Sequence, residues 1–347
     1  MNIILATGGT GGHIFPAIAL AKALEAQGYK CTLFIDKQIY KSTGIQSYVL
    51  PLCKPSSHKL KFFFLLFYSC ILAVYNTRRL KPKLVIGFGS YASFSTLLAA
   101  KILFIPIILH EQNSVLGRVN RFFLKSAKLV ATSFPTTKYA QKDKCVVTGN
   151  FVGKEVLEMQ DMPENLNILI IAGSQGANFF DDVVSSAICD LPETIKKRIR
   201  IVQQCTKKNI SKVESLYKSE KINFELSEFF DDIEKKLTTS HLVISRAGAT
   251  SIAEITLSRR AAIYIPYPYS KDNHQFYNAK HIADVNAAVI IEQNGETKQN
   301  LTGLLLNLLS DSKKLYNMAS NTRKTEIKNG IINFIQMLTS KQNTKKY

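Results

Sequence analysis

The chain has 347 residues, long enough for two domains, and its hydrophobic fraction of 46% excludes a largely disordered protein. Lysine and arginine total 45 against 26 acidic residues, a formal net charge of +19, which predicts a negatively charged partner: nucleic acid, an anionic membrane surface or a phosphorylated substrate. A lysine-rich solvated surface is the alternative explanation, and no recognised nucleic-acid motif supports the first kind of partner.

The first half alternates strand-like and helix-like segments. Residues 3–6 form an apolar run that predicts a buried strand, and residues 14–26 have apolar residues at helical spacing. Further strands are expected at residues 31–35, 84–86, 105–109, 128–132 and 145–147, with a small-residue helix at 91–100. This alternation predicts a parallel sheet with helices on both faces, which binds ligands at the carboxyl ends of its strands.

The second half repeats this plan without repeating the sequence. A strand is expected at residues 167–171, a glycine turn at 173–176 and a helix at 177–189. Polar residues and a proline interrupt the apolar pattern within residues 152–165, which we interpret as the linker. We therefore expect an α/β protein of two doubly wound domains, residues 1–155 and 156–325.

One uncharged apolar segment, residues 62–75, interrupts the alternation. Its 14 residues fall short of the roughly 20 that a membrane-spanning helix needs. Two interpretations remain: a helix buried in the domain, or a helix whose aromatic face enters a membrane interface beside flanking basic residues. The phenylalanines exceed what one core-facing stripe requires and favour the membrane. The residues expected to face it are Phe62, Phe63, Phe64, Leu66 and Phe67.

A glycine-rich stretch, residues 7–13, joins the first expected strand to the first expected helix. Its four glycines leave backbone N–H groups uncovered next to a helix N-terminus, where the helix dipole favours an anionic or strongly polar ligand. A tight turn is the alternative. The stretch matches neither Gly-x-Gly-x-x-Gly nor the P-loop pattern.

Other glycine-rich or polar clusters also follow expected strands, at residues 87–91, 110–113, 173–176 and 246–250. Together the five clusters predict a ligand held in the cleft between two facing sheets.

These motifs closely resemble the MurG family of bacterial peptidoglycan enzymes, the undecaprenyl-diphospho-muramoylpentapeptide β-N-acetylglucosaminyltransferases of glycosyltransferase family 28. The resemblance covers residues 2 to about 325 and rests on residues 8–17, 87–91, 110–113, 148–150, 173–177, 245–254 and 271–275. It implies the GT-B fold, two Rossmann-like domains facing each other across a cleft. It also implies that a C-terminal helix, about residues 326–347, packs back on the first domain.

The reaction that the resemblance implies is an inverting transfer of N-acetylglucosamine from UDP-N-acetylglucosamine to the C4 hydroxyl of lipid I, which gives lipid II. No tightly bound cofactor or metal is expected, and Asp231-Asp232 lacks the spacing of a metal-binding Asp-x-Asp. The enzyme is expected to be peripheral, on the cytoplasmic face of the plasma (inner) membrane. Cell-wall synthesis proteins are candidate partners.

The resemblance also implies residue roles. In the second domain, Ser174 matches the diphosphate ligand, Phe230 the uracil contact, Glu254 the ribose ligand and Gln275 the ligand of the transferred sugar. The remaining expected donor-binding residues are Gln175, Ala249, Thr250, Ser251, Ile252 and Ala253 in that domain, and Thr10, Gly11, Gly12 and Asn113 in the first.

The acceptor is expected at Gly87, Gly89, Ser90 and Tyr91. His13 is the candidate base for the acceptor hydroxyl, since an inverting transfer requires that hydroxyl to be deprotonated. Glu111 and Asp272 are the rival bases, and His110 is expected to support its loop.

Two departures from the family pattern stand out. Gly153 replaces an arginine that contacts the donor, with Lys154 as the nearest substitute. Ser90 and Ser95 replace a glycine and a proline in the second glycine loop. A serine is costly where the backbone needs a positive φ, so we expect altered affinity with activity retained. The competing hypotheses are a GT-B transferase with another acceptor and a non-catalytic subunit that binds a UDP-sugar.

Overall fold

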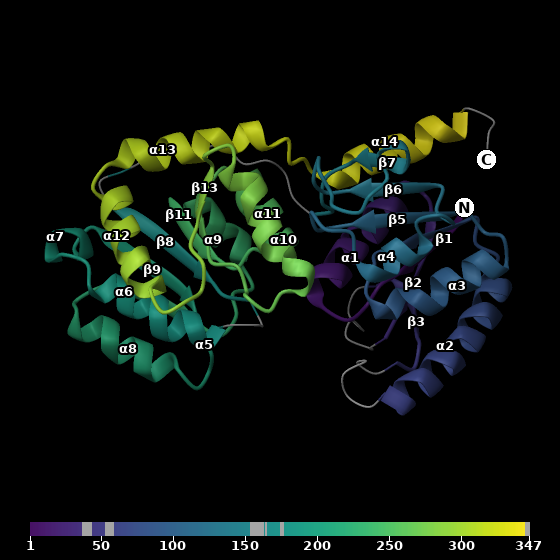
Figure 1. Cartoon of the computed structure of the whole chain (residues 1–347), viewed down its shortest axis with the longest axis horizontal. Coiled ribbons are helices and arrows are strands. Elements are labelled where there is room, and N and C mark those ends of the chain that lie inside the picture. The colour runs from purple at the N-terminus through teal and green to yellow at the C-terminus, as the bar shows by residue number, and fades with distance from the viewer. Residues whose placement is uncertain (37–43, 53–58, 153–162, 164, 174–176, 344–347) are drawn as a thin grey trace. The chain divides into compact units, whose positions relative to one another are not determined.

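The computed structural model describes the chain except residues 37–43, 53–58, 153–162, 164, 174–176 and 344–347. It divides into two compact units (Figure 1): Met1–Lys154 with Lys328–Tyr347, and Glu155–Ile327.

The first unit is built on a seven-stranded parallel sheet with the order β3-β2-β1-β4-β5-β6-β7. Its strands are β1 (Asn2–Ala6), β2 (Lys30–Ile35), β3 (Gln46–Val49), β4 (Leu84–Gly87), β5 (Ile107–Glu111), β6 (Leu129–Thr132) and β7 (Cys145–Val147). The order reverses at β1, which pairs with both β2 and β4. This is the topological switch point, where parallel sheets bind ligands.

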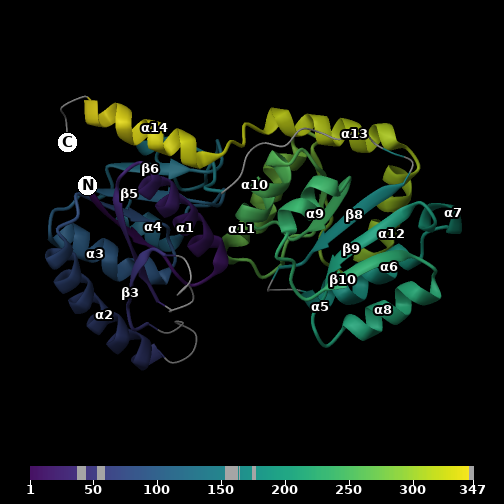
Figure 2. The ribbon, with the colours of Figure 1, turned by 180° about the vertical axis from the view of Figure 1, so that it is seen from behind.

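Helices cover both faces of this sheet, because successive strand residues point to opposite sides. Ile3 and Leu5 face α1 (Gly11–Ala26) and α14 (Gly330–Asn343), whereas Ile4 faces the other core. That core is covered by α2 (Lys59–Leu80), α3 (Phe94–Ile102) and α4 (Arg118–Phe123), and α2 and α3 lie side by side in both views (Figures 1 and 2).

The C-terminal helix α14 belongs to the first unit. Phe334 is fully buried, with its ring centroid 5.1 Å from that of Phe151. The chain enters this helix beside Gly149, where the N–H of Gly330 donates to the carbonyl oxygen of Asn150 at 2.8 Å. Gly149 has a φ of +99°, and a Cβ there would lie 2.2 Å from the carbonyl oxygen of Lys328, so only glycine fits this crossing.

Helix α2 contains the uncharged segment and is longer than that segment, because the flanking basic residues are helical too. One side packs inward through Ser69, Ala73 and Thr77. The opposite side, the α2 apolar stripe, is exposed and consists of Leu60, Phe63, Phe64, Phe67, Tyr68, Ile71 and Tyr75. By length and composition alone, the helical stretch Leu60–Leu80 could cross a membrane, because it extends beyond the 14-residue uncharged segment at both ends.

The second unit is built on a six-stranded parallel sheet with the order β10-β9-β8-β11-β12-β13. Its strands are β8 (Leu166–Ile171), β9 (Ile199–Gln204), β10 (Asn223–Ser227), β11 (Leu242–Ser245), β12 (Ala261–Tyr264) and β13 (Ala288–Ile290). Its switch point lies between β8 and β11, which repeats the plan of the first unit.

The helices of this unit are α5 (Ala177–Phe179), α6 (Ser185–Cys189), α7 (Glu193–Lys196), α8 (Ile210–Ser219), α9 (Ile233–Thr239), α10 (Ala249–Leu257), α11 (His274–Ala283), α12 (Thr297–Leu309) and α13 (Ser312–Asn321). The helix expected at residues 177–189 is interrupted by a π-helical turn, Phe180–Val184. Buried Asp181 lies in this turn and accepts hydrogen bonds from the backbone N–H and the hydroxyl of Thr206.

Candidate functional site

Three loops of the first unit meet at the carboxyl ends of β1, β4 and β5, which are neighbours in the sheet. The glycine loops after β1 and β4 pack closely. A Cβ on Gly8 would lie 2.5 Å from Cβ of Ala92, and a Cβ on Gly9 would lie 2.4 Å from Oγ of Ser90. Glycine is therefore required by this packing as well as by the positive φ of both residues.

Asp36, just after β2, ties these two glycine loops together. Its buried carboxylate accepts hydrogen bonds from the N–H of Gly9 at 3.1 Å and from the hydroxyl of Tyr91 at 2.7 Å. Asp36 lies outside the motifs that predicted the site. The available signal was an acidic residue at the end of an expected strand.

Ser90 has a φ of 67° and a ψ of 157°, a region that is essentially reserved for glycine. The loop therefore does need a positive φ at the position where Ser90 replaces the family's glycine, and the serine is strained there. The carbonyl oxygen of Ser90 accepts a hydrogen bond from the hydroxyl of Ser93 at 3.0 Å, which helps to hold the conformation.

His13 lies half-buried in the first turn of α1. Its Nδ1 is 2.8 Å from the carbonyl oxygen of Phe88 and 3.2 Å from Oε1 of Gln112. The amide nitrogen of Gln112 lies 3.2 Å from both the Phe88 oxygen and Nδ1 of His110. The structure thus joins the loops after β1, β4 and β5 through side chains that are about 100 residues apart in the chain.

His110 and Glu111 are the last residues of β5, whereas the sequence predicted a loop at 110–113. The strand extends further because both residues pair with β6. His110 is buried, with its ring stacked on that of Phe151 at a centroid distance of 3.8 Å. Burial lowers the pKa of His110 to about 3, so its ring is neutral at physiological pH.

Glu111, a rival candidate base, is buried and fully engaged. Its Oε1 accepts from the backbone and side-chain N–H groups of Asn113 at 3.1 and 3.3 Å. Its Oε2 accepts from the N–H of Gly117 at 2.8 Å and from Nδ2 of Asn120 at 2.9 Å. Four N–H donors satisfy an ionised carboxylate, and the arrangement holds the loop that carries Asn113.

In the second unit, β8 and β11 are paired, so their carboxyl ends are neighbours. The N–H of Arg246 donates to the carbonyl oxygen of Ile171 at 3.3 Å, which joins the ends of the two strands. Helix α10 begins at Ala249, after Gly248 as its N-cap, so its N-terminal amides stand at this strand end.

Within the expected donor segment, Ala249, Ile252 and Ala253 are buried against the unit, and Thr250, Ser251 and Glu254 are half-buried. The partly accessible side chains are therefore the polar ones. Ser174 and Gln175, and the departures at Gly153 and Lys154, lie outside the described residues.

Arg246 supports this region from inside. Its guanidinium donates to the carbonyl oxygen of Ile265 at 2.9 Å and to Oε1 of Gln293 at 2.7 Å, and it lies over the ring of Phe180. Burial lowers its pKa to about 10, so Arg246 stays charged at neutral pH. It orders the loop before α10 and adds positive charge there.

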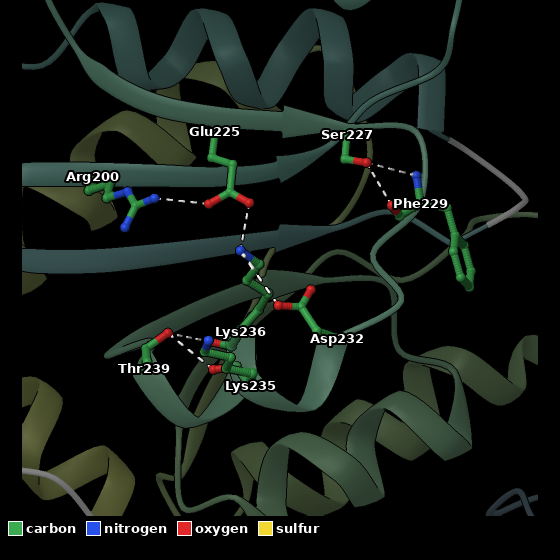
Figure 3. A network of polar contacts seen from close by, with 8 residues as sticks. All are labelled: Arg200, Glu225, Ser227, Phe229, Asp232, Lys235, Lys236 and Thr239. Carbon is green, nitrogen blue, oxygen red and sulfur yellow. Dashed lines mark hydrogen bonds and ion pairs between the residues drawn. The ribbon is translucent and has the colours of Figure 1, made fainter.

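Figure 3 shows the polar network around the loop that carries Phe230, between β10 and α9. The hydroxyl of Ser227 donates to the carbonyl oxygen of Phe229 at 2.6 Å, which tightens the turn. Lys236 pairs with Glu225 at 2.5 Å and lies 5.5 Å from the ring centroid of Phe230. Phe230 itself is buried.

Asp232 precedes α9 and has a contact of 3.9 Å with Lys236. Among the described residues, no group of three or more His, Cys, Asp or Glu side chains could hold a metal ion.

Gln275 lies at the start of α11, where its Oε1 accepts from the N–H of Tyr267 at 2.9 Å. Asp272, the other rival base, is exposed and has a φ of 53°.

Comparisons with known proteins follow the same division. The glycosyltransferase family 28 N-terminal domain matches residues 3–132, and the family's C-terminal domain matches residues 167–334.

The chain is similar to the UDP-N-acetylglucosamine–N-acetylmuramyl-(pentapeptide) pyrophosphoryl-undecaprenol N-acetylglucosamine transferase of Wolbachia pipientis subsp. Culex pipiens, with 70% identity over 97% of this chain and 98% of the relative. The transferase of the same name from Anaplasma marginale is 41% identical over 93% and 94% of the two chains. A crystal structure of Acinetobacter baumannii MurG superposes with a TM-score of 0.82 at 29% identity, covering 98% of this chain and 99% of that one.

Proposed function

The chain belongs to glycosyltransferase family 28 and, within it, to the MurG transferases, and from this membership we propose that it makes lipid II. It transfers N-acetylglucosamine from UDP-N-acetylglucosamine to the C4 hydroxyl of the muramoyl sugar of lipid I, with inversion. The observation that carries this proposal is 70% identity to a transferase of that name over nearly the whole length of both chains.

His13 acts as the base in this proposal. Its Nδ1 is occupied by two oxygen acceptors, so Nε2 is the ring nitrogen that can take the proton of the acceptor hydroxyl. The engagement of both Glu111 oxygens by N–H donors supports His13 over that rival. The glycine loop with Ser90 and Tyr91 is adjacent and is assigned to the acceptor, with Gly87 and Gly89.

The donor is assigned mainly to the second unit. The N-terminal amides of α10 stabilise the leaving diphosphate, and Glu254 in the same helix accepts hydrogen bonds from the ribose hydroxyls. The backbone of Phe230 contacts the uracil, and the amide of Gln275 binds the transferred sugar. Thr10, Gly11, Gly12 and Asn113, in the first unit, remain donor-binding residues that the family resemblance implies.

A donor titration followed by a turnover assay tests this function. We expect UDP-N-acetylglucosamine and UDP to bind the wild type by calorimetry, Glu254→Ala to weaken both, and lipid I to be converted to lipid II. Donor binding without turnover of lipid I would favour a non-catalytic UDP-sugar-binding subunit, and turnover of another acceptor alone would reassign the substrate. Loss of activity in EDTA that magnesium restores would contradict the metal-free mechanism.

The finer proposal is that the enzyme works as a peripheral protein on the cytoplasmic face of the inner membrane. The α2 apolar stripe supports it, since Phe63, Phe64 and Phe67 are 65%, 73% and 68% exposed. Phe62 and Leu66, also expected to face the membrane, are half-buried. Arg78 and Arg79 in the last turn of α2 supply charge for anionic head groups.

Vesicle sedimentation tests the membrane contact. Phe63→Ser with Phe67→Ser should weaken binding to anionic vesicles while leaving the melting temperature unchanged, because both side chains are mostly exposed. The matched control is Phe229→Ser with Tyr269→Ser, which removes two exposed aromatic rings from the second unit. If both double variants weakened vesicle binding equally, or if Phe63→Ser with Phe67→Ser unfolded the protein, the α2 apolar stripe would be excluded as the membrane contact.

A further inference from the structure

The ring nitrogens of His13 have a determined protonation pattern when the ring is neutral. Nδ1 lies 2.8 Å from the carbonyl oxygen of Phe88. A backbone carbonyl only accepts hydrogen bonds, so Nδ1 must carry the proton. Nε2 then has a lone pair, and among the described residues it has no hydrogen-bond partner.

The same carbonyl determines the orientation of Gln112. A side-chain nitrogen of Gln112 lies 3.2 Å from the Phe88 oxygen, and only the NH₂ group can donate to it. This leaves Oε1 of Gln112 toward His13, at 3.2 Å from Nδ1, where it accepts the same proton. The NH₂ group also faces Nδ1 of His110 at 3.2 Å.

His110 completes the chain of hydrogen bonds with the opposite tautomer. Its Nδ1 accepts from Gln112, so its proton is on Nε2, which faces the carbonyl oxygen of Gly149 at 3.4 Å. Two carbonyl oxygens, at Phe88 and Gly149, thus allow one self-consistent arrangement of protons. Burial keeps His110 neutral, so it cannot reverse the arrangement by taking a second proton.

We infer that Gln112, itself held by His110, is a positioning residue that acts together with the Phe88 carbonyl to keep Nε2 of His13 unprotonated and available for the acceptor hydroxyl. The inference rests on the proposed function, in which His13 is the base. In the transfer, the hydroxyl O–H bond breaks and its proton moves to Nε2. The hydroxyl oxygen bonds to C1 of N-acetylglucosamine, and UDP leaves with the electrons of its bond to C1.

Gln112 stabilises the resulting imidazolium with a neutral oxygen. The carboxylates at the same sheet edge, Asp36 and Glu111, are bound to loop N–H and hydroxyl donors. The charged residues on the other elements that pack on α1 lie away from His13: β1 has none, Lys30 lies at the opposite end of β2, and Lys341 lies in the last turn of α14. A carboxylate introduced at residue 112 would lie against Nδ1 of His13, where Oε1 of Gln112 now lies.

The first test reads the tautomers directly and needs no activity. In the full chain labelled with ¹⁵N-histidine, long-range ¹H–¹⁵N spectra should show His13 protonated on Nδ1 and His110 protonated on Nε2. The two signals are assigned by their loss in His13→Gln and His110→Gln. A His13 ring protonated on Nε2 would overturn the inference, whether or not the protein transfers a sugar.

The second test changes the charge at residue 112. Gln112→Glu is isosteric and places a carboxylate beside His13, which should raise the pKa of the base and move the acid limb of kcat/KM upward by about one pH unit or more. Gln46→Glu, an exposed position on β3, adds the same charge elsewhere and should leave the limb unchanged. Affinity for UDP-N-acetylglucosamine should stay the same in both variants.

An unshifted limb in Gln112→Glu, or an equal shift in Gln46→Glu, would refute the positioning role. Should Gln112→Glu fail to fold, Gln112→Met keeps the size but removes both hydrogen-bonding groups. It should lower kcat about tenfold or more with donor affinity retained, and an unchanged kcat would refute the role. Absence of lipid I turnover in the wild type would instead reject the proposed function.

Discussion

Replacing Ser90 by glycine should stabilise the first unit. Ser90 has a φ of 67° and a ψ of 157°, and a non-glycine residue there costs about 1–3 kcal/mol. Glycine removes this strain, but it also makes the unfolded chain more flexible, which lowers the free energy of unfolding by about 0.4–1 kcal/mol. The hydroxyl lies against Gly9, and removing it leaves only a small gap. The net expectation is a gain of about 1 kcal/mol in the free energy of unfolding.

The assay is urea unfolding of the full chain followed by hydrogen exchange of peptides from β1 and β4, which reports on the first unit. The matched control is Ser93→Gly, the same chemical change three residues away at a φ of −78°. It loses the hydrogen bond to the carbonyl oxygen of Ser90 and should destabilise the unit by about 1 kcal/mol. Destabilisation by Ser90→Gly, or equal effects of the two variants, would refute the strain argument.

Three further predictions follow from the first unit. Folding lowers the pKa of His110 from 6.5 to about 3, so the unfolded state binds more protons between these pH values. The free energy of unfolding therefore decreases as the pH falls below 6.5, by up to about 1.4 kcal/mol per pH unit. His110→Gln should remove this contribution to the pH dependence of stability, measured by urea unfolding at several pH values. Phe334→Ala should cost about 3–5 kcal/mol, against little change for exposed Ile332→Ala, and an equal effect would exclude docking of α14. His13→Ala should lower kcat by about 10²–10⁴ with donor affinity retained, and the reverse pattern in steady-state kinetics would reject its role as the base.

Much of the fold could be predicted from the sequence because it depends on local patterns. Buried parallel strands are short apolar runs, and the strands expected at residues 3–6, 31–35 and 145–147 lie within one residue of β1, β2 and β7. Glycines also predicted the turns after β1 and β4, where Gly8, Gly9 and Gly89 have a positive φ. The prediction failed for His110 and Glu111, since polar residues at a strand end indicate a loop unless a neighbouring strand extends the pairing.

The length and exposure of α2 could not be predicted in the same way. Its uncharged segment is apolar nearly all round, so the sequence predicted only part of the outward side: Phe63, Phe64 and Phe67 are exposed as expected, whereas Phe62 and Leu66 are half-buried. The structure decides this because Ser69, Ala73 and Thr77 are small enough to let α2 approach the layer below, which leaves the larger aromatic side chains outside.

By itself, the sequence determined the two-domain α/β plan, the family and His13 as the candidate base. Only the tertiary structure placed Asp36 between two glycine loops and connected His13 through Gln112 to His110. The physical reason is that the strand order of a parallel sheet brings loops together that are far apart in the chain. Hydrogen-bond partners depend on distances within about an ångström, which residue patterns along the chain do not encode.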